Sequence, residues 1–285
     1  VMRLVGSEMC IRDSISRVSN KIIKLLGDPN YVIQGGSFHA MEYYTRTIIG
    51  SQVGDFWGYQ VDGIFQSQDE VDALTYSDDN GQTQLTYGPT VGPGDYRFVD
   101  QNEDGQINEE DKVKIGSPYP DFTMGFTGDL SYKGFDLNIF LYWNYGNEIF
   151  NTVKVFTETP YEQTNMSSYM LTDAWRPDNT NATIAQLGGD RQNNYSRASD
   201  AYIEDGSFLR FKNISLGYTI PENLSRKANI EKLRFYVALQ NYFTISKYSG
   251  RDPELGSTWG VFVQKADLGN YTIPKTLNFG INATF

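Results

Sequence analysis

Hydrophobic and polar side chains alternate along several segments of this chain. Between Phe135 and Tyr145, the odd-numbered positions hold Phe, Leu, Ile, Leu, Trp and Tyr, whereas most of the even-numbered positions hold Asp, Asn or Tyr. A period of two residues is typical of a β-strand that has one apolar and one polar face. The segment that begins at Phe122 has the same pattern, and only Lys133 and Gly134 separate the two segments. The sequence therefore predicts a tight β-hairpin here.

More strands are expected on both sides of this hairpin. We predict them at about residues 207–220, 232–246 and 271–285, with weaker ones near 15–25, 40–49 and 55–65. Within the first of these segments the apolar positions change parity, because Leu209 and Phe211 are odd-numbered whereas Ile214 and Leu216 are even-numbered. This change indicates either a β-bulge or a point at which the strand leaves a bilayer.

The connections between the strands are short and long in turn. The turn at Lys133-Gly134 is followed by a long connection over about 147–204, a short one over 221–231 and a long one over about 247–270. Outer-membrane barrels have short periplasmic turns and long external loops in this alternation. The predicted fold class is therefore all-β: an antiparallel transmembrane β-barrel portion of about eight strands with long extracellular loops. Phe285 would then lie at the periplasmic rim.

A soluble β-sandwich is the alternative fold, because one sheet face packed on a core also produces a period of two. The polar face of the predicted strands is rich in Asn, Thr, Gly and Asp, and the chain contains 20 Tyr and 17 Phe residues. Aromatic residues of this abundance suit the interfacial girdles of a barrel. The pattern therefore favours the barrel over the sandwich.

Charge and composition narrow the function classes further. No run of the sequence approaches the roughly 18 consecutive apolar residues of a membrane-spanning helix. The formal net charge of −11 argues against a nucleic-acid partner, because phosphate binding requires clustered Lys and Arg. Cys10 is the only cysteine in the sequence, so no disulfide within the chain is possible.

The first residues differ from the rest of the chain. Residues 1–14 have no strand period, no helix cap and no turn signal, and they resemble a translated sequencing adaptor. No secretory signal is recognisable in them. We expect 1–14 to be a non-native or disordered tail, 15–285 to be the C-terminal part of a barrel, and the front of the natural protein to lie outside this sequence.

An acidic segment between two of the predicted strands matches the twelve-residue calcium loop. Gly105 occupies the sixth place, where the loop turns sharply, and Asp111 takes the last place instead of the usual Glu. Helices are not expected on either side, so the site would be a staple for a long loop and not a helix-loop-helix sensor. A merely solvated acidic turn is the alternative. The predicted Ca²⁺ ligands are Asp100, Asn102, Asp104, Gln106 (through its backbone carbonyl), Asn108 and Asp111.

Five blocks of the sequence, in order and spacing, resemble the C-terminal region of SusC/RagA-type TonB-dependent transporters. Two of them are GDYRFVDQNEDGQIN at 94–108 and SFLRFKNISLGY at 207–218. The other three cover 54–67, 115–126 and 271–281. Together they extend the resemblance over essentially everything from residue 15 onward.

This resemblance implies a role in nutrient import and not in enzymatic catalysis. It implies a 22-stranded barrel in the outer membrane of Bacteroidota-like bacteria, in contact with outer-membrane lipid, with a SusD-like surface lipoprotein as partner. Uptake of glycan oligosaccharides, or of peptides, would be energised by the TonB complex acting on an N-terminal plug region that is expected to lie outside this chain. A soluble, calcium-stabilised β-sandwich that binds glycans is the alternative function.

Candidate sites within the chain are few. Aromatic residues that could stack on sugar rings are Trp57, Tyr59, Trp175 and Trp259, although girdle or packing roles are the simpler explanation. An enzymatic function is not expected, because the sole histidine, His39, lies outside any nucleophile motif and Cys10 falls in the atypical first segment.

Overall fold

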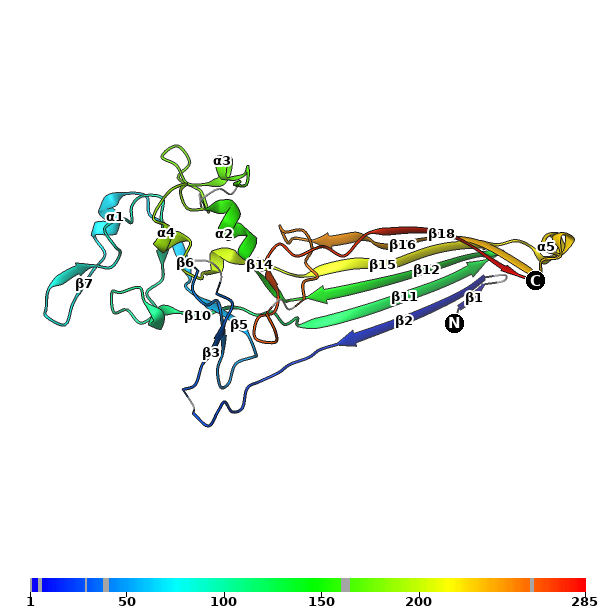
Figure 1. The fold of residues 1–285 in the computed structure, drawn as a ribbon, viewed down its shortest axis with the longest axis horizontal. Helices are drawn as coiled ribbons and strands as arrows, with labels where there is room; N and C mark the ends of the chain where they lie inside the picture. The colour runs from blue at the N-terminus through cyan, green and yellow to red at the C-terminus, as the bar shows by residue number, and fades with distance from the viewer. Residues whose placement is uncertain (1, 5–6, 29, 38–40, 160–164, 257–258) are drawn as a thin grey trace.

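The computed structural model describes residues 2–4, 7–28, 30–37, 41–159, 165–256 and 259–285. One long sheet forms half of the molecule, and shorter strands, helices and loops gather beyond one of its ends (Figure 1). Among the described residues, no helix combines the length and the apolar character needed to pass through a membrane.

The long sheet, called the wall below, has seven strands within the described residues. Their order is β1-β2-β11-β12-β15-β16-β18, and every neighbouring pair is antiparallel. The predicted hairpin and the three later strands are thereby confirmed. The strands are β1 (Met2–Leu4), β2 (Ser7–Ser16), β11 (Phe122–Tyr132), β12 (Phe135–Tyr145), β15 (Phe208–Thr219), β16 (Lys232–Ser246) and β18 (Thr276–Thr284).

The register of the wall separates apolar from polar side chains, as the sequence pattern predicts. Residues directly opposite one another on neighbouring strands lie on the same face. One row across the apolar face consists of Leu137, Leu216, Val237 and Phe279. The next row, on the polar face, consists of Asn138, Ser215, Ala238 and Asn278.

The short connections all lie at one end of the wall and the long ones at the other (Figure 1). Lys133 and Gly134 have φ values of 46° and 88°, which are the two positive angles that a two-residue hairpin turn of type I′ needs. The connection from β15 to β16 is also short and contains α5 (Glu222–Ser225) and the 3-10 helix η3 (Arg226–Ala228). The long connections, 146–207 and 247–275, extend from the opposite end. The predicted alternation is confirmed.

A β-bulge explains the change of parity along β15. The pairing with β16 shifts between Phe211 and Asn213, and the pairing with β12 shifts at the same place. Relative to β12 the extra residue is Lys212 of β15, whereas relative to β16 the extra residue lies in β16, next to Asn241, whose φ is 53°. Because Phe211 and Leu209 pair with Phe243 and Ile245, the same face of the sheet stays apolar beyond the shift. Of the two predicted explanations, the bulge is therefore correct.

The N-terminal segment differs from the prediction. Residues 7–16 form β2, which pairs with β11 from Thr123 to Tyr132, so the expectation of a segment without strand structure is wrong. Asp13 lies opposite Phe126 on the apolar face, between Ile11 and Ile15. It is the residue of this strand that least suits an apolar surface. The foreign origin of 1–14 stays a prediction.

The weaker upstream strands do not belong to the wall. In place of long strands near 40–49 and 55–65 the structure has three- and four-residue strands in separate small sheets, and residues 17–24 of the predicted 15–25 strand form none. The wall has seven strands instead of about eight, because these segments lie outside it while β1 and β2 belong to it. The small sheets are β10-β5-β4-β3 (Val113–Gly116, Asp55–Gly58, Thr45–Thr47, Ile33–Gly35), β14-β13-β17 (Ile203–Asp205, Glu148–Asn151, Ala266–Asp267), β6-β9 (Val61–Ile64, Tyr96–Phe98) and β7-β8 (Thr75–Ser77, Thr83–Leu85).

These small sheets and the loops around them form the external region, which has its own apolar packing. One buried cluster surrounds Phe65 and Trp175, and a second surrounds Tyr44 and Phe150, whose rings stack with centroids 4.2 Å apart. The 247–275 loop contributes Val263 to the second cluster. The remaining helices of the region are α1 (Gln68–Asp72), α2 (Thr152–Glu158), α3 (Met170–Asp173), α4 (Arg191–Asn194), η1 (Glu109–Asp111) and η2 (Asp200–Tyr202).

An ion pair spans three strands on the polar face near the short-turn end of the wall. Arg234 of β16 donates from Nε to Asp136 of β12 at 2.8 Å, although β15 lies between these strands. The guanidinium crosses β15 over Gly217, where an added Cβ would collide with it. Glycine is therefore required at 217 because the ion pair occupies the space of a side chain.

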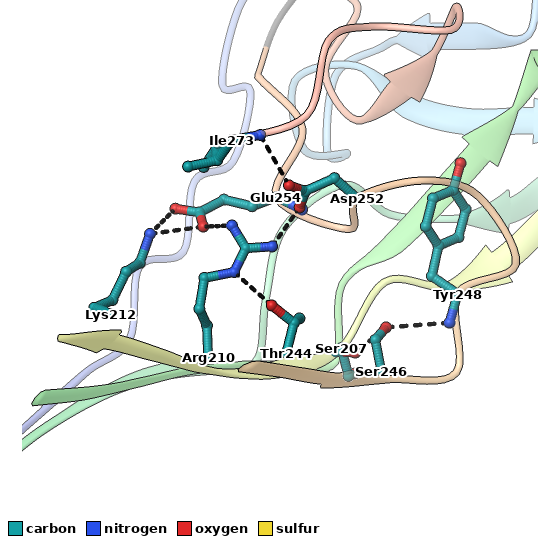
Figure 2. Close-up of polar contacts among 9 residues, drawn as sticks. All are labelled: Ser207, Arg210, Lys212, Thr244, Ser246, Tyr248, Asp252, Glu254 and Ile273. Carbon is teal, nitrogen blue, oxygen red and sulfur yellow. Dashed lines mark hydrogen bonds and ion pairs between the residues drawn. The ribbon is translucent and has the colours of Figure 1, made fainter. Parts of the chain in front are cut away.

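A buried arginine ties the 247–275 loop to the long-loop end of the wall. The Arg210 side chain is only 3% exposed, and its guanidinium donates to Asp252, to Glu254 at 2.7 Å and to Thr244 at 3.0 Å (Figure 2). Lys212 also donates to Glu254, at 2.7 Å. We call Arg210, Lys212, Asp252 and Glu254 the Arg210 cluster.

The Arg210 cluster fixes both ends of the loop. The second carboxylate oxygen of Asp252 accepts a hydrogen bond from the backbone N–H of Ile273 at 3.2 Å, close to the start of β18 (Figure 2). Burial alone would raise the pKa of Asp252, but the hydrogen bonds from Arg210 and from the Glu254 backbone hold this pKa below its usual range. Asp252 is therefore ionised at neutral pH, and the loop folds back onto the wall.

Substituting Gly217→Ala should break the three-strand ion pair, because the new Cβ takes the position of the Arg234 guanidinium. We expect the refolded chain to lose about 1 kcal/mol of unfolding free energy, measured by urea titration in detergent. Gly128→Ala is the matched control, because a Cβ there meets only Phe126 at an ordinary 3.6 Å. Equal stability of the two variants would contradict the role given to Gly217.

Substituting Arg210→Met should release the loop, because the carboxylates of Asp252 and Glu254 lose their buried partner. Removing one member of a buried ion pair costs about 3–5 kcal/mol. We expect faster hydrogen exchange of the backbone amides over 247–275, read out by mass spectrometry. Lys212→Met is the control, because Lys212 is 22% exposed and contacts only Glu254 within the cluster. Similar exchange in both variants would rule out Arg210 as the anchor.

Candidate functional site

The polar face of the wall carries a chain of side-chain hydrogen bonds across four strands. Arg12 donates to Asp129 at 2.9 Å, and the other carboxylate oxygen of Asp129 accepts from Asn138 at 2.7 Å. Asn138 in turn accepts from Asn213 at 2.7 Å. Arg12 is 70% exposed and Asp129 is 39% exposed, so this ion pair adds little stability. What it provides is a hydrated, hydrogen-bonding surface suited to an aqueous lumen.

The aromatic candidates fall into two groups. Tyr59 and Trp175 are buried in the first apolar cluster, and the indole N–H of Trp175 donates to Gln66 at 2.9 Å. Trp57 is half-buried, with the Arg46 guanidinium 5.7 Å from its ring centre, and Trp259 is 44% exposed. Trp57 and Trp259 therefore keep surface that a ligand could reach, whereas Tyr59 and Trp175 are positioned as packing residues.

The Tyr59 ring has cations close to it. The Lys112 ammonium lies 5.2 Å and the Arg197 guanidinium 4.9 Å from the ring centre. Lys112 is itself buried and pairs with Glu42 and Glu109. Burial raises the pKa of the Tyr59 hydroxyl above its usual range. The Tyr59 hydroxyl is therefore uncharged, and the Tyr59 ring packs against the Lys112 and Arg197 cations.

The predicted calcium loop is folded around Gly105, which has a φ of +80°. Asp100 accepts from the Gly105 backbone N–H at 2.6 Å, and Asp104 accepts from the Gln106 N–H at 2.7 Å. Asn102 accepts from the Asp104 N–H at 3.1 Å. The segment therefore turns sharply at Gly105, as expected from the sequence, and three of its side-chain oxygens accept from backbone amides.

The end of this loop is buried. Asp111 is fully buried and accepts from the Asn108 and Gln101 N–H groups at 2.7 and 2.8 Å. Asn108 caps the 3-10 helix η1, accepting from the Glu110 N–H. In the part of the chain that the structure describes, no three His, Cys, Asp or Glu side chains are gathered so as to hold a metal ion. One carboxylate oxygen of Asp100 is nevertheless buried and has no hydrogen-bond partner there.

The acidic charge of the protein is concentrated in the external region. Residues 62–111 contain 13 Asp and Glu residues and a single basic residue, Arg97. The formal charge of this segment is therefore −12, which accounts for the whole net charge of −11. Such a surface attracts cations and repels anions over about a Debye length.

Two buried polar centres were not predicted from the sequence. Asp95 is 1% exposed and accepts from the Gly92 N–H at 2.9 Å, the Asn194 amide at 2.8 Å and the Asp190 N–H at 3.1 Å, which joins segments about a hundred residues apart. Glu158 accepts from the Tyr169 hydroxyl at 2.8 Å, and burial raises its pKa. The only signal for Asp95 is the turn sequence that precedes it, whereas nothing local marks Glu158. His39, the sole histidine, lies outside the described residues.

Similarity to curated proteins covers nearly the whole chain. No family model matches it. It is 32% identical over 281 residues to "TonB-dependent receptor P3" of Formosa agariphila, which spans 95% of this chain and 26% of that protein. It is 31% identical over 273 residues to "TonB-dependent receptor SusC" of Bacteroides thetaiotaomicron, spanning 93% of this chain and 23% of that protein. The chain thus spans about a quarter of the length of these relatives, whose names describe receptors and no enzyme.

Solved structures agree at the level of the fold. The whole chain superimposes on 28% of a chain in the "Structure of the RagAB peptide transporter", with a TM-score of 0.73 and 22% sequence identity. The "closed-closed" state of the RagAB peptide importer gives a TM-score of 0.72. The two-faced antiparallel wall, the order of its connections and these similarities lead to one conclusion: the chain is a segment of the SusC/RagA type of TonB-dependent receptor.

Proposed function

We propose that this chain forms part of the wall and the external mouth of a TonB-energised importer in the outer membrane of a Bacteroidota-like bacterium. The observation that carries this proposal is the separation of faces in the wall. Its apolar rows suit lipid, and its polar rows, with the Asp129–Asn138–Asn213 chain, suit a water-filled lumen.

The exposure of the apolar face weighs against a soluble β-sandwich. Phe279 is 77% exposed, Ile281 65% and Phe135 51%. A sandwich would bury these side chains against a second sheet. Monomeric soluble proteins rarely expose contiguous apolar patches of such extent.

The cargo we propose is a glycan oligosaccharide or a peptide. The relative named SusC and the peptide-transporting RagAB are the two points of comparison. Trp57 and Trp259 are the aromatic contacts that remain candidates for sugar stacking, because each keeps accessible ring surface. The acidic segment 62–111 favours neutral or cationic cargo over anionic cargo by electrostatic repulsion.

Two protein partners belong to the same proposal. A SusD-like surface lipoprotein would cover the external region, which lies beyond the long-loop end of the wall (Figure 1). The TonB complex would energise uptake through the plug region of the full-length receptor. A pull-down from outer membranes with the full-length receptor, in which no surface lipoprotein co-purifies, would count against the first partner.

A charge on the outer face should disturb membrane assembly far more than the same charge on the inner face. We expect Ile214→Arg to cost about 2–4 kcal/mol near the bilayer midplane and to reduce the detergent-extracted, heat-modifiable protein in outer-membrane fractions. Ser215→Arg is the matched control, because it is the next residue of β15 and faces the polar side. Recovery of the wild-type chain from the aqueous fraction without detergent would contradict the transporter proposal and favour the soluble glycan-binding module.

We propose in addition that the 100–111 loop binds Ca²⁺ through Asp100, Asn102, Asp104, Gln106, Asn108 and Asp111. The support is the loop turn at Gly105 and the buried, unpartnered oxygen of Asp100. The ion would serve as a staple for the external region.

Calcium should therefore protect the 92–116 segment from protease, and the double substitution Asp100→Ala with Asp104→Ala should abolish the calcium-dependent part of this protection. Comparison with and without a chelator separates metal binding from the loss of the Asp100 and Asp104 hydrogen bonds. Asp79→Ala, in the β7–β8 hairpin, is the control. Calcium-dependent protection that persists in the double variant refutes the site.

A further inference from the structure

Lys265 is held in a strained position of the 247–275 loop. Its φ is 54°, in the left-handed region that glycine adopts freely but that costs free energy for a residue with a Cβ. The backbone is fixed there, because the Lys265 carbonyl accepts from the Phe150 N–H at 3.0 Å and the next residue, Ala266, pairs with Phe150. Strained residues of this kind concentrate at binding sites, which makes the Lys265 side chain a candidate ligand contact.

The Lys265 ammonium has no ion-pair partner in the part of the chain that the structure describes. It lies near the Arg210 cluster, since the charges that act on it are those of Glu254, Asp252 and Arg210. None of the described carboxylates comes within ion-pair distance of it. Lys265 is half-buried, and this burial lowers the pKa of its ammonium against the opposing effect of the two carboxylates. An anionic ligand would stabilise the charged form again.

The carboxylates of the cluster cannot supply the missing partner, because other donors already occupy them. Asp252 accepts from Arg210 and from the backbone N–H groups of two further residues, at 2.9 and 3.2 Å. Glu254 accepts from Arg210 at 2.7 Å through one oxygen and from Lys212 at 2.7 Å through both. With Lys265, three cations therefore share two carboxylates, and one positive charge has no counterpart.

We propose that Lys265 binds the C-terminal carboxylate of a peptide cargo at the mouth of the lumen. The Arg210 cluster beside it lies between the polar face of the wall and the 247–275 loop (Figure 2). A carboxylate supplies the one negative charge that this group lacks, and its hydrogen bond to an ammonium is stronger than that of a neutral oxygen. This inference rests on the proposed importer function and selects the peptide from the two proposed cargo classes.

The acidic segment 62–111 determines which carboxylate-bearing cargo fits. Its formal charge of −12 repels molecules that are anionic overall, such as oligosaccharides of uronic acids. A short peptide has an ammonium at one end and a carboxylate at the other, so it is neutral overall at pH 7. Such a peptide is not repelled by the acidic segment and still carries one carboxylate for Lys265. A neutral glycan has no group that would use this cation.

Binding of tetraalanine and of its C-terminal amide to the full-length receptor in detergent tests the contact, measured by isothermal titration calorimetry. We expect Lys265→Met to weaken the binding of tetraalanine about tenfold and not to weaken the binding of the amide. Lys265→Gly should do the same, and because glycine suits the left-handed backbone, it excludes a folding defect as the cause. Lys275→Met is the matched control and should bind as wild type, because the Lys275 ammonium lies outside the cluster, 5.8 Å from the centre of the Tyr242 ring.

The outcomes separate this inference from the proposal on which it rests. Equal affinity of wild type and Lys265→Met for tetraalanine, or no binding to either, overturns the carboxylate contact and leaves the membrane location of the wall untouched. Binding of tri-galacturonate that depends on Lys265, without such binding of tetraalanine, overturns the choice of a peptide. If wild type is soluble without detergent, the importer proposal and the inference fail together.

Discussion

Backbone hydrogen bonding within the sheet is the constraint on which this structure depends. A strand surrounded by hydrocarbon cannot bond its N–H and C=O groups to water, so each must be paired with a neighbouring strand. The antiparallel register from β2 to β18 provides those partners over long, continuous ladders. Once these hydrogen bonds fix the register, successive side chains alternate between the two faces. The two-faced surface follows from that pairing and from the binary pattern of the sequence.

Side chains on the polar face of the wall then form contacts between the paired strands. Asp136 and Arg234 belong to strands that are not neighbours, and their pairing is possible because Gly217 has no side chain to separate them. Asn138 links Asp129 to Asn213 in the same manner, from one strand to the next. Partly exposed pairs of this kind contribute about 1 kcal/mol or less to stability. These contacts instead determine which side chains of different strands lie together at a given position along the strands.

Much of the wall could be predicted from the sequence because its strands are long. Five or more alternating positions in 122–132, 135–145 and 276–284 leave little ambiguity about strand and face. The same rule failed for 40–65, where strands of three or four residues are too short to show a period. It failed for 7–16 as well, because Asp13 interrupts the apolar positions and the pairing with β11 determines the strand.

The candidate sites were predictable only where their residues are local. The turn around Gly105 was predicted because all its residues lie within one segment. The centres at Asp95 and Arg210 were not predicted. The distant partners of Asp95 lie about 90 to 100 residues away along the chain, and those of Arg210 about 40 residues away. Burial is also a tertiary property. Alternation could not tell the packed Tyr59 and Trp175 from the accessible Trp259.

The bulge in β15 links the wall to the loop above it. If β15 continued through Lys212 as a regular strand, Arg210 would point to the apolar face, because each residue reverses the direction of the next side chain. The extra residue restores the direction, so Leu209 and Phe211 stay on the apolar face and Arg210 lies on the polar face (Figure 2). Lys212 adds a second cation beside it, and the acidic residues of the 247–275 loop neutralise both. The bulge is therefore required for the contacts of Asp252 and Glu254. Without it, these loop carboxylates would have no cation to bind on the polar face of the wall.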